Sequence, residues 1–397
     1  MVFQFLKSVG SEWAALRRFA RATRAGDALV FYAEGPADWP HFEAIVGELT
    51  GTHGLSLLYV TSDARDPVLD APPRGVTPFC VGSGGARTVF FQSVAARVVV
   101  MTLPDLDTFH LKRSVHPSHY VYLFHAISST HRVYRRGAFD AYDTILCVGP
   151  HHVEEIRETE RVYGLPPKRL VEHGYGRLDA ILTRARDLPP FVPSEGSRKR
   201  VVVAPSWGEC SLLEQSYGVD VLRILLDAGH DVTLRLHPMT VRHRSRMVED
   251  LRRGFTRQPG FTLELDMRAQ ESLQRADLMI GDWSGAATEF AFGLERPVLS
   301  IDTPPKINNP EHGEIASPPL EDRIRREIGE VVSPRELSAL LPAVVRLAAP
   351  GGEWAARIRQ ARARWIFNPG RSGAVGAETI AAIYRGAAET KQLEAVT

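Results

Sequence analysis

Continuous apolar runs separated by amphipathic segments characterise the first half of the chain. The runs are ALVFYAE (28–34), LSLLYVTSD (55–63), ARVVVMTLPD (96–105), YVYLFHAISS (120–129) and DTILCVGP (143–150). Apolar and polar residues do not alternate within them, as is typical of strands that are buried on both faces of a parallel sheet. Helical patterns follow two of the runs, over residues 40–50 and 152–163. Alternating strands and helices predict a doubly wound α/β domain.

A second series of the same kind follows an interruption rich in proline, glycine and charge, RDLPPFVPSEGSRKR, which we interpret as a linker over residues 186–200. Its strands are RVVVAPSW, DVTLRLHP, FTLELD, DLMIGDWS and PVLSIDT, with helices predicted over 212–228 and 241–255. The sequence therefore predicts two Rossmann-like domains, 1–185 and 201–350, that face each other across a cleft. Helices over about 354–365 and 376–390, within a segment 351–397, are expected to brace both domains.

The first 24 residues predict a basic amphipathic helix. Its apolar positions at helical spacing are Phe5, Leu6, Val9, Trp13, Leu16 and Phe19, and its basic residues are Lys7, Arg17, Arg18, Arg21 and Arg24. Such a helix can lie on an anionic membrane surface. It can equally pack its apolar stripe on the adjoining domain, and both interpretations stay open.

The composition limits the class of protein without identifying it. Hydrophobic residues make up 44% and charged residues 24% of 397, which is typical of a globular chain. The net charge of +1 gives no electrostatic argument for a nucleic-acid partner. Three widely spaced cysteines predict reduced, buried thiols. No apolar run approaches the roughly 20 residues that cross a bilayer, so we expect a cytoplasmic protein, peripheral on the inner face of the membrane if residues 1–24 bind lipid.

Small and hydroxyl residues collect between a strand and a helix in DWSGAATEF, residues 282–290. A helix N-terminus presents free N–H groups and partial positive charge, which suits an anion. Ser284, Gly285 and Thr288 would let a phosphate approach the backbone and would donate hydroxyl hydrogen bonds. In the alternative interpretation, Asp282 or Ser284 is an ordinary N-cap and nothing binds there.

Other chemically capable side chains also fall at predicted strand ends. His125 ends one strand and can accept a proton from a hydroxyl, unless it only hydrogen-bonds within its loop. Ser206 ends the first strand of the second domain and is expected to contribute to donor binding. Arg235 and His237 end the next strand, where the two side chains can bind a phosphate and stabilise a leaving group, or else form a salt bridge and a cap.

A glycine-rich turn, EHGYGRLD, adds Arg177 at the start of a helix as a further candidate for donor binding. The turn offers backbone donors and a cation, although most such turns only reverse the chain. Four further histidines, His110, His116, His119 and His131, match no zinc-binding spacing, so no metal is expected.

Taken in order, these motifs resemble those of the CDP-glycerol glycerophosphotransferase family, the teichoic-acid-type polymerases and primases of the GT-B superfamily. The corresponding stretches here are FHAIS at 124–128, GYGRLD at 174–179, APSW at 204–207, RLHP at 235–238 and DWSGAATEFAFGLERPVLS at 282–300, followed by the tail NPGRSGAVGAETIAAIY. The order and approximate spacing agree from about residue 120 to 300. Departures from the family pattern are Ala126-Ile127-Ser128 in place of Gly-Thr-Pro, Gly285 in place of a second serine, and Gly176 in place of proline.

The resemblance implies a GT-B fold and a division of roles among the residues. His125 would be the base, His237 and Ser284 would bind the phosphates of the donor, and Glu289 would meet the ribose hydroxyls. A carboxylate can accept hydrogen bonds from both hydroxyls of a ribose. No cofactor is implied.

The function expected on these grounds is transfer of glycerol phosphate, or a related alditol phosphate, from a CDP-activated donor to a hydroxyl of a cell-surface polymer or lipid-linked acceptor. His125 would remove the proton of that hydroxyl, while Arg235, His237 and Ser284 would neutralise the departing nucleotide phosphate. One alternative is a GT-B glycosyltransferase that uses a nucleotide sugar for cell-envelope glycans, and a UDP-sugar epimerase ranks below it. A second is a noncatalytic nucleotide-binding protein, which the altered FHAIS stretch favours.

Overall fold

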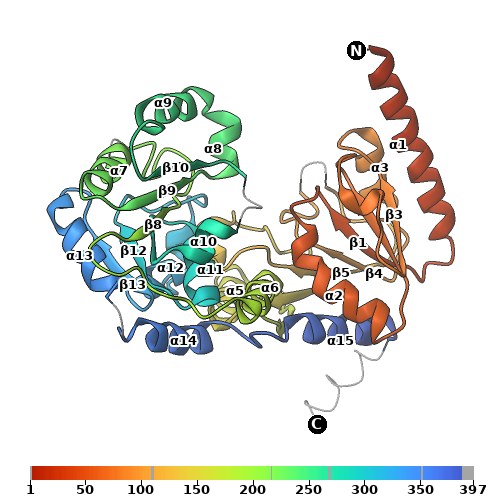
Figure 1. Ribbon diagram of the computed structural model, residues 1–397. Coiled ribbons are helices and arrows are strands. Elements are labelled where there is room, and N and C mark those ends of the chain that lie inside the picture. Colours follow the sequence, from red (N-terminus) through yellow and green to blue (C-terminus); the bar gives the residue numbers. More distant parts are fainter. Residues whose placement is uncertain (1, 109–110, 216, 267–269, 350–351, 387–397) are drawn as a thin grey trace, which may run out of the picture. The chain divides into compact units, whose positions relative to one another are not determined.

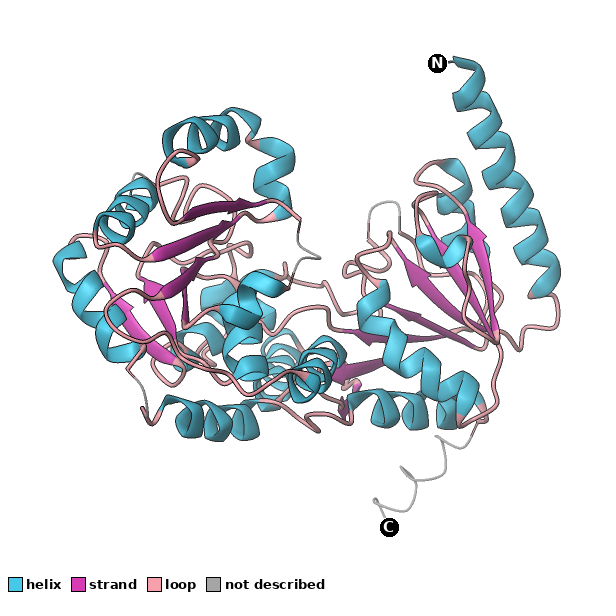
Figure 2. Cartoon of the chain, viewed as in Figure 1, coloured by secondary structure: helices cyan, strands magenta, loops and turns pink. Residues whose placement is uncertain are grey.

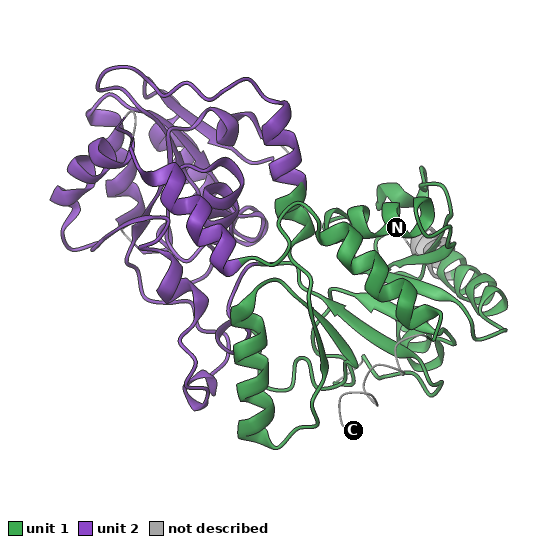
Figure 3. Cartoon of the chain, turned by 90° about the horizontal axis from the view of Figure 1, so that it is seen from below, with its two compact units in different colours: residues 1–126, 134–179, 366–397 green, residues 127–133, 180–365 purple. Residues whose placement is uncertain are grey.

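The computed structural model describes residues 2–108, 111–215, 217–266, 270–349 and 352–386, with the backbone alone for residues 2–9. His110 and the end of the last predicted helix, 387–390, lie outside these ranges. The described chain divides into two compact units (Figure 3). Unit 1 comprises residues 1–126, 134–179 and 366–397, and unit 2 comprises residues 127–133 and 180–365.

Unit 1 is built on a seven-stranded, fully parallel sheet in the order β3-β2-β1-β4-β5-β6-β7 (Figure 1). Its strands are β1 (Leu29–Ala33), β2 (Leu57–Thr61), β3 (Val76–Cys80), β4 (Val98–Met101), β5 (His119–Leu123), β6 (Thr144–Cys147) and β7 (Arg169–Glu172). Its helices are α1 (Val2–Ala22), α2 (Trp39–Gly51), α3 (Gly85–Ser93), α5 (Pro150–Tyr163) and α15 (Ser372–Tyr384), with a 3-10 turn at Pro67–Leu69. The order reverses between β1 and β4, as it does in a Rossmann fold.

Both faces of this sheet are covered by helices. Phe42 of α2 and Ile380 of α15 are buried in one core cluster with the strand residue Phe31. On the other face, Phe19 of α1 packs edge-on against Phe79 and Phe90, with ring centroids 5.6 and 5.1 Å away. Burial on both faces explains why the strands read as unbroken apolar runs.

Unit 2 repeats the plan with six parallel strands in the order β10-β9-β8-β11-β12-β13. Figure 2 shows its strands together with the helices around them. The strands are β8 (Arg200–Val203), β9 (Asp231–Arg235), β10 (Phe261–Glu264), β11 (Leu278–Gly281), β12 (Val298–Ile301) and β13 (Gly329–Val332). The helices are α4 (Thr130–Val133), α7 (Tyr217–Asp227), α8 (Pro238–His243), α9 (Ser245–Phe255), α10 (Glu271–Arg275), α11 (Gly285–Leu294), α12 (Leu320–Ile324), α13 (Leu340–Leu347) and α14 (Trp354–Trp365), with 3-10 turns at His312–Glu314 and Leu337–Ala339. The switch point lies between β8 and β11. The prediction of two Rossmann-like sheets is confirmed.

The chain passes between the units at several places. Helix α6 (Gly176–Asp187) begins in unit 1 and ends in unit 2, and the short segment 127–133 groups with unit 2 although β5 and β6 on either side of it belong to unit 1. The sequence pattern, by contrast, predicts one domain over residues 1–185. Near the other end, α14 belongs to unit 2 and α15 to unit 1.

The side chains of α1 that are described pack on unit 1. Leu16 and Phe19 are buried, whereas Arg17, Arg18 and Arg21 are exposed. None of the described helices is long and apolar enough to cross a bilayer. All three cysteines are free thiols, but only Cys147 is buried, so the expectation of burial is wrong for Cys80 and Cys210.

Candidate functional site

In unit 2, the predicted donor-binding residues collect at the carboxyl end of the parallel strands. Ser206 follows β8, His237 follows β9 and Ser284 follows β11. Neighbouring parallel strands end at the same edge of a sheet, and the switch point between β8 and β11 opens at this edge. Unit 2 therefore brings together residues that lie up to 78 positions apart, from 206 to 284.

Asp282 holds two of these loops together. Its carboxylate, only 3% exposed, accepts hydrogen bonds from the backbone N–H of Ser206 and of Leu212, each at 2.7 Å. Burial raises the pKa of Asp282, and the hydrogen bonds that it accepts oppose this effect. The hydroxyl of Ser206 is also bonded to Asp282. The contact between Ser206 and Asp282 thus holds the loop after β8 against the loop after β11. It explains why the APSW and DWSG motifs lie next to each other in the structure.

His237 is held as a neutral hydrogen-bond donor. Its Nδ1 accepts the backbone N–H of Met239 at 3.1 Å and so caps α8. Burial, together with the charge of Lys306, lowers the pKa of His237 to about 4. The neutral ring with Nδ1 as acceptor carries its proton on Nε2. His237 can therefore donate to a phosphate oxygen at pH 7 without carrying a charge.

Trp207 and Lys306 lie beside His237. The rings of Trp207 and His237 are stacked with centroids 6.0 Å apart, and Lys306 Nζ lies 4.2 Å from the centroid of the Trp207 ring. Lys306 is half-buried, and this burial lowers its pKa, while the Asp282 carboxylate raises it. An aromatic face, a neutral donor and a cation are thus grouped at one sheet edge, an arrangement suited to a nucleotide phosphate.

Ser284 occupies the N-cap position of α11 with extended backbone, yet its side chain makes no capping hydrogen bond. The hydroxyl is consequently not used to close the first turn of this ten-residue helix. At Gly285, a Cβ atom would meet nothing within 4 Å, so this position adjoins open space. Thr288 is buried in the helix and Glu289 is half-buried beside it.

Arg235 has a different environment from the one that the sequence suggested. Its guanidinium is only 3% exposed and forms a salt bridge with Glu264, its register partner on β10. A buried arginine paired in this way stabilises the sheet edge. The salt-bridge alternative describes this side chain, and we do not include Arg235 among the phosphate ligands.

In unit 1, His125 lies two residues beyond β5 and is mostly buried. Burial lowers its pKa, and the carboxylate of Asp38 and a hydrogen bond with the backbone of Thr102 partly offset this effect. Its Nδ1 is buried without a hydrogen-bond partner in the described chain. Asp38 itself accepts hydrogen bonds from Thr102 Oγ1 at 3.0 Å and from the backbone N–H of Glu34 at 2.7 Å. A neutral imidazole in reach of a carboxylate's field is a competent proton acceptor.

His41, in the first turn of α2, lies near His125. The two rings have centroids 6.2 Å apart, and Tyr175 lies 5.7 Å from the His41 ring and donates its hydroxyl to the carbonyl of His125 at 3.0 Å. Burial, with smaller contributions from His125 and Arg177, lowers the pKa of His41 to about 3. Arg177 at the start of α6 thus contributes a positive charge in the neighbourhood of His41.

The GYGRLD turn is fixed by the tail motif NPGRSG. Gly174 has φ +108°, and a Cβ there would lie 2.4 Å from the carbonyl oxygen of Phe367. Asp179 accepts hydrogen bonds from the backbone N–H of Gly370 and Ser372, at 2.5 and 2.8 Å. These contacts join two motifs that are almost 200 residues apart and hold the N-terminus of α15.

The segment after His125, residues 127–133, is bound to other parts of unit 2. The backbone N–H of Ser129 donates to Glu321 at 3.0 Å, and Arg132 forms a bidentate pair with Asp322 at 2.8 and 2.5 Å. Asn309 Nδ2 donates to the carbonyl of His131 at 2.8 Å. The altered Ala126-Ile127-Ser128 sequence therefore leads into a well-bonded segment.

Lys306 and His41 were missed by the sequence reasoning. Lys306 lies in TPPKINN, a few residues beyond a predicted strand, and the same rule that selected His237 would have found it. His41 lies inside a predicted helix, where nothing in the pattern distinguishes it from a core position. In the described ranges, no group of His, Cys, Asp and Glu side chains is arranged to hold a metal ion.

Comparisons with known proteins establish the fold. No protein-family model matches the chain. No curated protein matches it significantly in sequence. A variant of the wall teichoic acid polymerase TagF soaked with CDPG has a similar structure, with 14% identity over 98% of this chain and 99% of that one and a TM-score of 0.57.

UDP-GlcNAc 2-epimerases are similar to this chain too. The enzyme from Methanocaldococcus jannaschii, in complex with UDP-GlcNAc and UDP, shares 12% identity over 90% of this chain and 99% of its own, with a TM-score of 0.54. The Neisseria meningitidis enzyme bound to UDP-GlcNAc shares 11% over 89% and 98%, with a TM-score of 0.57. The chain has a GT-B fold.

Proposed function

We propose that the protein is a transferase that moves glycerol phosphate, or a related alditol phosphate, from a CDP-activated donor to a hydroxyl group of a cell-envelope acceptor. The observation that carries the proposal is the group at the carboxyl edge of unit 2: a neutral His237 with its Nε2–H available, Lys306 beside it, and Ser284 with its hydroxyl unused in capping. The ordered motifs and the likeness to a teichoic acid polymerase structure over nearly the whole chain support this choice of donor.

In the proposed reaction, the acceptor oxygen attacks the phosphorus that carries the alditol. The proton of the acceptor hydroxyl passes to His125, which burial keeps neutral at pH 7. The bond between that phosphorus and the oxygen bridging the two phosphates breaks, and its electron pair leaves with CMP. His237, Lys306 and the first turn of α11 stabilise the charge on the departing phosphate. Glu289 is assigned to the ribose hydroxyls and Thr288 to support of the helix N-terminus.

A nucleotide-sugar glycosyltransferase is the second candidate. It is favoured by the similar structures that contain UDP-GlcNAc or UDP. The same unit 2 residues would bind a nucleoside diphosphate, and the acceptor would attack the anomeric carbon instead of phosphorus. The two candidates differ in the atom that is attacked and in the leaving group, which is CMP in the first and a nucleoside diphosphate in the second.

The deciding experiment is calorimetric titration of the protein with CDP, CMP, UDP and GDP, repeated with the variants His237→Asn and Ser284→Ala. Asparagine can still accept the N–H of Met239 as an N-cap but does not extend to the Nε2 position. Ser284→Ala removes a hydroxyl that makes no cap, so folding should be unaffected. Each change should weaken nucleotide binding about tenfold or more, because hydrogen bonds to charged groups contribute about 1.5–3 kcal/mol. His243→Ala, on the exposed side of α8, is the matched control.

Tight binding of cytidine nucleotides that both variants lose would support the glycerophosphotransferase assignment. A preference for UDP or GDP would replace it by the sugar transferase. Binding without any turnover of CDP-alditols or nucleotide sugars would favour the noncatalytic alternative. No nucleotide binding at all would contradict the proposal.

A further inference from the structure

A separate pocket of about 740 Å³ lies in unit 2 at the opposite end of the sheet from His237 and Ser284. Arg200, the first residue of β8, and Arg296, two residues before β12, line it, so it adjoins the amino ends of the strands. Its other walls come from the end of α6, from the segment 188–192 and from α14. The volume is in the range of small-molecule sites. We call it the arginine pocket.

The lining of the arginine pocket carries a large positive charge. The five arginines that line it are Arg186, Arg200, Arg275, Arg296 and Arg362, against one acidic residue, Glu295. Three of them have carboxylate partners: Arg200 pairs with Asp277, Arg275 with Glu271, and Arg362 with Glu295. Arg186 and Arg296 form no salt bridge in the part of the chain that the structure describes. Two of the five arginines at this pocket are therefore not engaged in an ion pair among the described residues.

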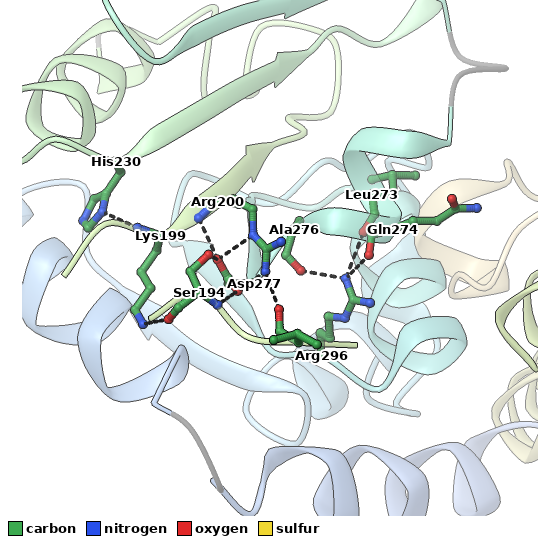
Figure 4. Close-up of polar contacts among 10 residues, drawn as sticks. Ser194, Lys199, Arg200, His230, Leu273, Gln274, Ala276, Asp277 and Arg296 are labelled. Atoms are coloured by element: carbon green, nitrogen blue, oxygen red, sulfur yellow. Dashed lines mark hydrogen bonds and ion pairs between the residues drawn. The ribbon is translucent and has the colours of Figure 1, made fainter. Parts of the chain in front are cut away.

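The lack of a salt bridge is more unexpected for Arg296 than for Arg186, because Arg296 is only 7% exposed. Its Nη1 donates to the carbonyl oxygens of Leu273, Gln274 and Ala276, at 3.2, 2.7 and 2.7 Å, and so closes the end of α10 (Figure 4). These bonds account for one nitrogen of the guanidinium. Its Nε is buried with no hydrogen-bond partner among the described residues. Burial and the neighbouring Arg200 lower the pKa of Arg296 to about 10, and the Asp277 carboxylate partly offsets this effect.

The same pocket has an exposed apolar wall. The guanidinium of Arg296 lies 3.5 Å from the centroid of the Phe191 ring. Phe191 remains 37% exposed and its neighbour Val192 70% exposed, and both line the pocket. Phe191 and Val192 thus give the pocket an apolar wall directly beside its arginines.

We propose that the arginine pocket binds a dianionic organic phosphate, a phosphate monoester whose body is apolar. Two negative charges match the two unpaired arginines, and the apolar body would cover Phe191 and Val192. Arginine suits this role because its planar guanidinium presents several donors to phosphate oxygens. The site is distinct from the proposed donor site, which uses the other end of the sheet. Because the segment 188–192 forms one wall, an occupied pocket would also hold that segment against the rest of unit 2.

Binding of simple phosphates to the full chain, measured by calorimetry, tests this proposal. The probes are hexyl phosphate, phenyl phosphate and inorganic phosphate, which share the charged group and differ in the body. We expect the two monoesters to bind at least tenfold more tightly than inorganic phosphate. Stronger binding of phenyl phosphate would identify a flat body such as a nucleoside, and stronger binding of hexyl phosphate an aliphatic one.

Charge-reversal variants identify the site. Arg186→Glu should weaken hexyl phosphate binding tenfold or more, whereas Arg184→Glu, on the same helix but outside the pocket lining, should leave it unchanged. Arg296→Lys keeps the charge but removes the stacked plane and the Nε donor, and should also weaken binding. His237→Asn should have no effect, which separates this site from the donor site. Monoesters that bind no better than inorganic phosphate, or equal affinities for Arg186→Glu and Arg184→Glu, would overturn the proposal.

Discussion

Burial, more than neighbouring charge, sets the protonation of the histidines in both units. It is the largest cause of the lowered pKa values of His41, His125, His173 and His237. A histidine kept neutral at pH 7 can accept a proton, as proposed for His125, or donate from one nitrogen without repelling Lys306, as proposed for His237. Opposite roles in a transfer reaction thus follow from a single physical cause.

The proposed base gives a prediction at the residue scale. His125→Ala should lower kcat roughly 100- to 10,000-fold, the usual contribution of a general base, with donor affinity unchanged. Because burial lowers the pKa of His125, the acid limb of the kcat/KM profile should have its midpoint below pH 6.5. Steady-state kinetics with the donor that calorimetry selects would measure both. An unchanged kcat, or a midpoint above 6.5, would exclude His125 as the base.

The sequence located these side chains to different degrees. His125, His237 and Ser284 follow apolar runs, so the rule that parallel strands end at one edge finds them. That rule cannot show which strand-end residue is already engaged, and so it assigned Ser206 and Arg235 to the donor, although Asp282 and Glu264 bind them. Long-range contacts of this kind leave no local pattern.

At the scale of the elements, the strands that the sequence reasoning missed are all at sheet edges. β3 contains Pro78, which removes a backbone donor and is tolerated at an edge, and β7 is a short strand that begins and ends in charged residues. β13 begins at Gly329, where a Cβ would collide with the carbonyl oxygen of Val298. Edge strands are only partly covered and lack the apolar run that identifies a central strand.

The link that Asp282 makes between β11 and the loop after β8 can be tested by Asp282→Ala. Two buried backbone N–H groups would lose their acceptor, so the free energy of unfolding should fall by about 2–4 kcal/mol. Urea denaturation measures this change. Asp250→Ala, an exposed position on α9, should change it by less than about 0.5 kcal/mol. A similarly small change for Asp282→Ala would mean that water replaces the carboxylate.

Helix α1 gives the prediction about membranes. We expect the protein to float with anionic liposomes at low salt, because basic residues near such a surface contribute about 1 kcal/mol each. Replacing the exposed Arg17, Arg18, Arg21 and Arg24 by glutamine should abolish flotation while leaving Phe19 in its core. Deleting residues 1–24 would remove Phe19 as well, so a loss of membrane binding could not be separated from a loss of packing in unit 1. No flotation, or equal flotation of the variant, would leave α1 as a packing helix only.

At the scale of the whole molecule, the buried histidines predict sensitivity to acid. Their folded pKa values lie below the ordinary value of 6.5, so between about pH 4 and 6.5 the unfolded chain binds more protons than the folded one. The free energy of unfolding therefore falls as the pH falls through this window. His173, fully buried with a pKa of about 4, should by itself contribute a loss on the order of 3 kcal/mol.

Urea denaturation between pH 7 and 4.5 measures this dependence. Asp282 and Glu34, whose pKa values are raised, act in the opposite direction and reduce the net slope. A free energy of unfolding that stays constant or rises as the pH falls to 4.5 would contradict this prediction.

The division of the chain between its units also bears on how it is made. Unit 1 holds β1 to β7, which leave the ribosome first, but its core includes Ala377, Ile380 and Ala381 of α15. The carboxylate of Asp179 likewise lacks its hydrogen-bond donors until Gly370 and Ser372 have been translated. Folding of the unit that is translated first can thus be completed only after all of unit 2 has been synthesised. During translation, the face of its sheet that α2 and α15 cover together stays partly exposed. Chaperones that recognise apolar surface would therefore be able to bind this face for longer than other parts of the chain.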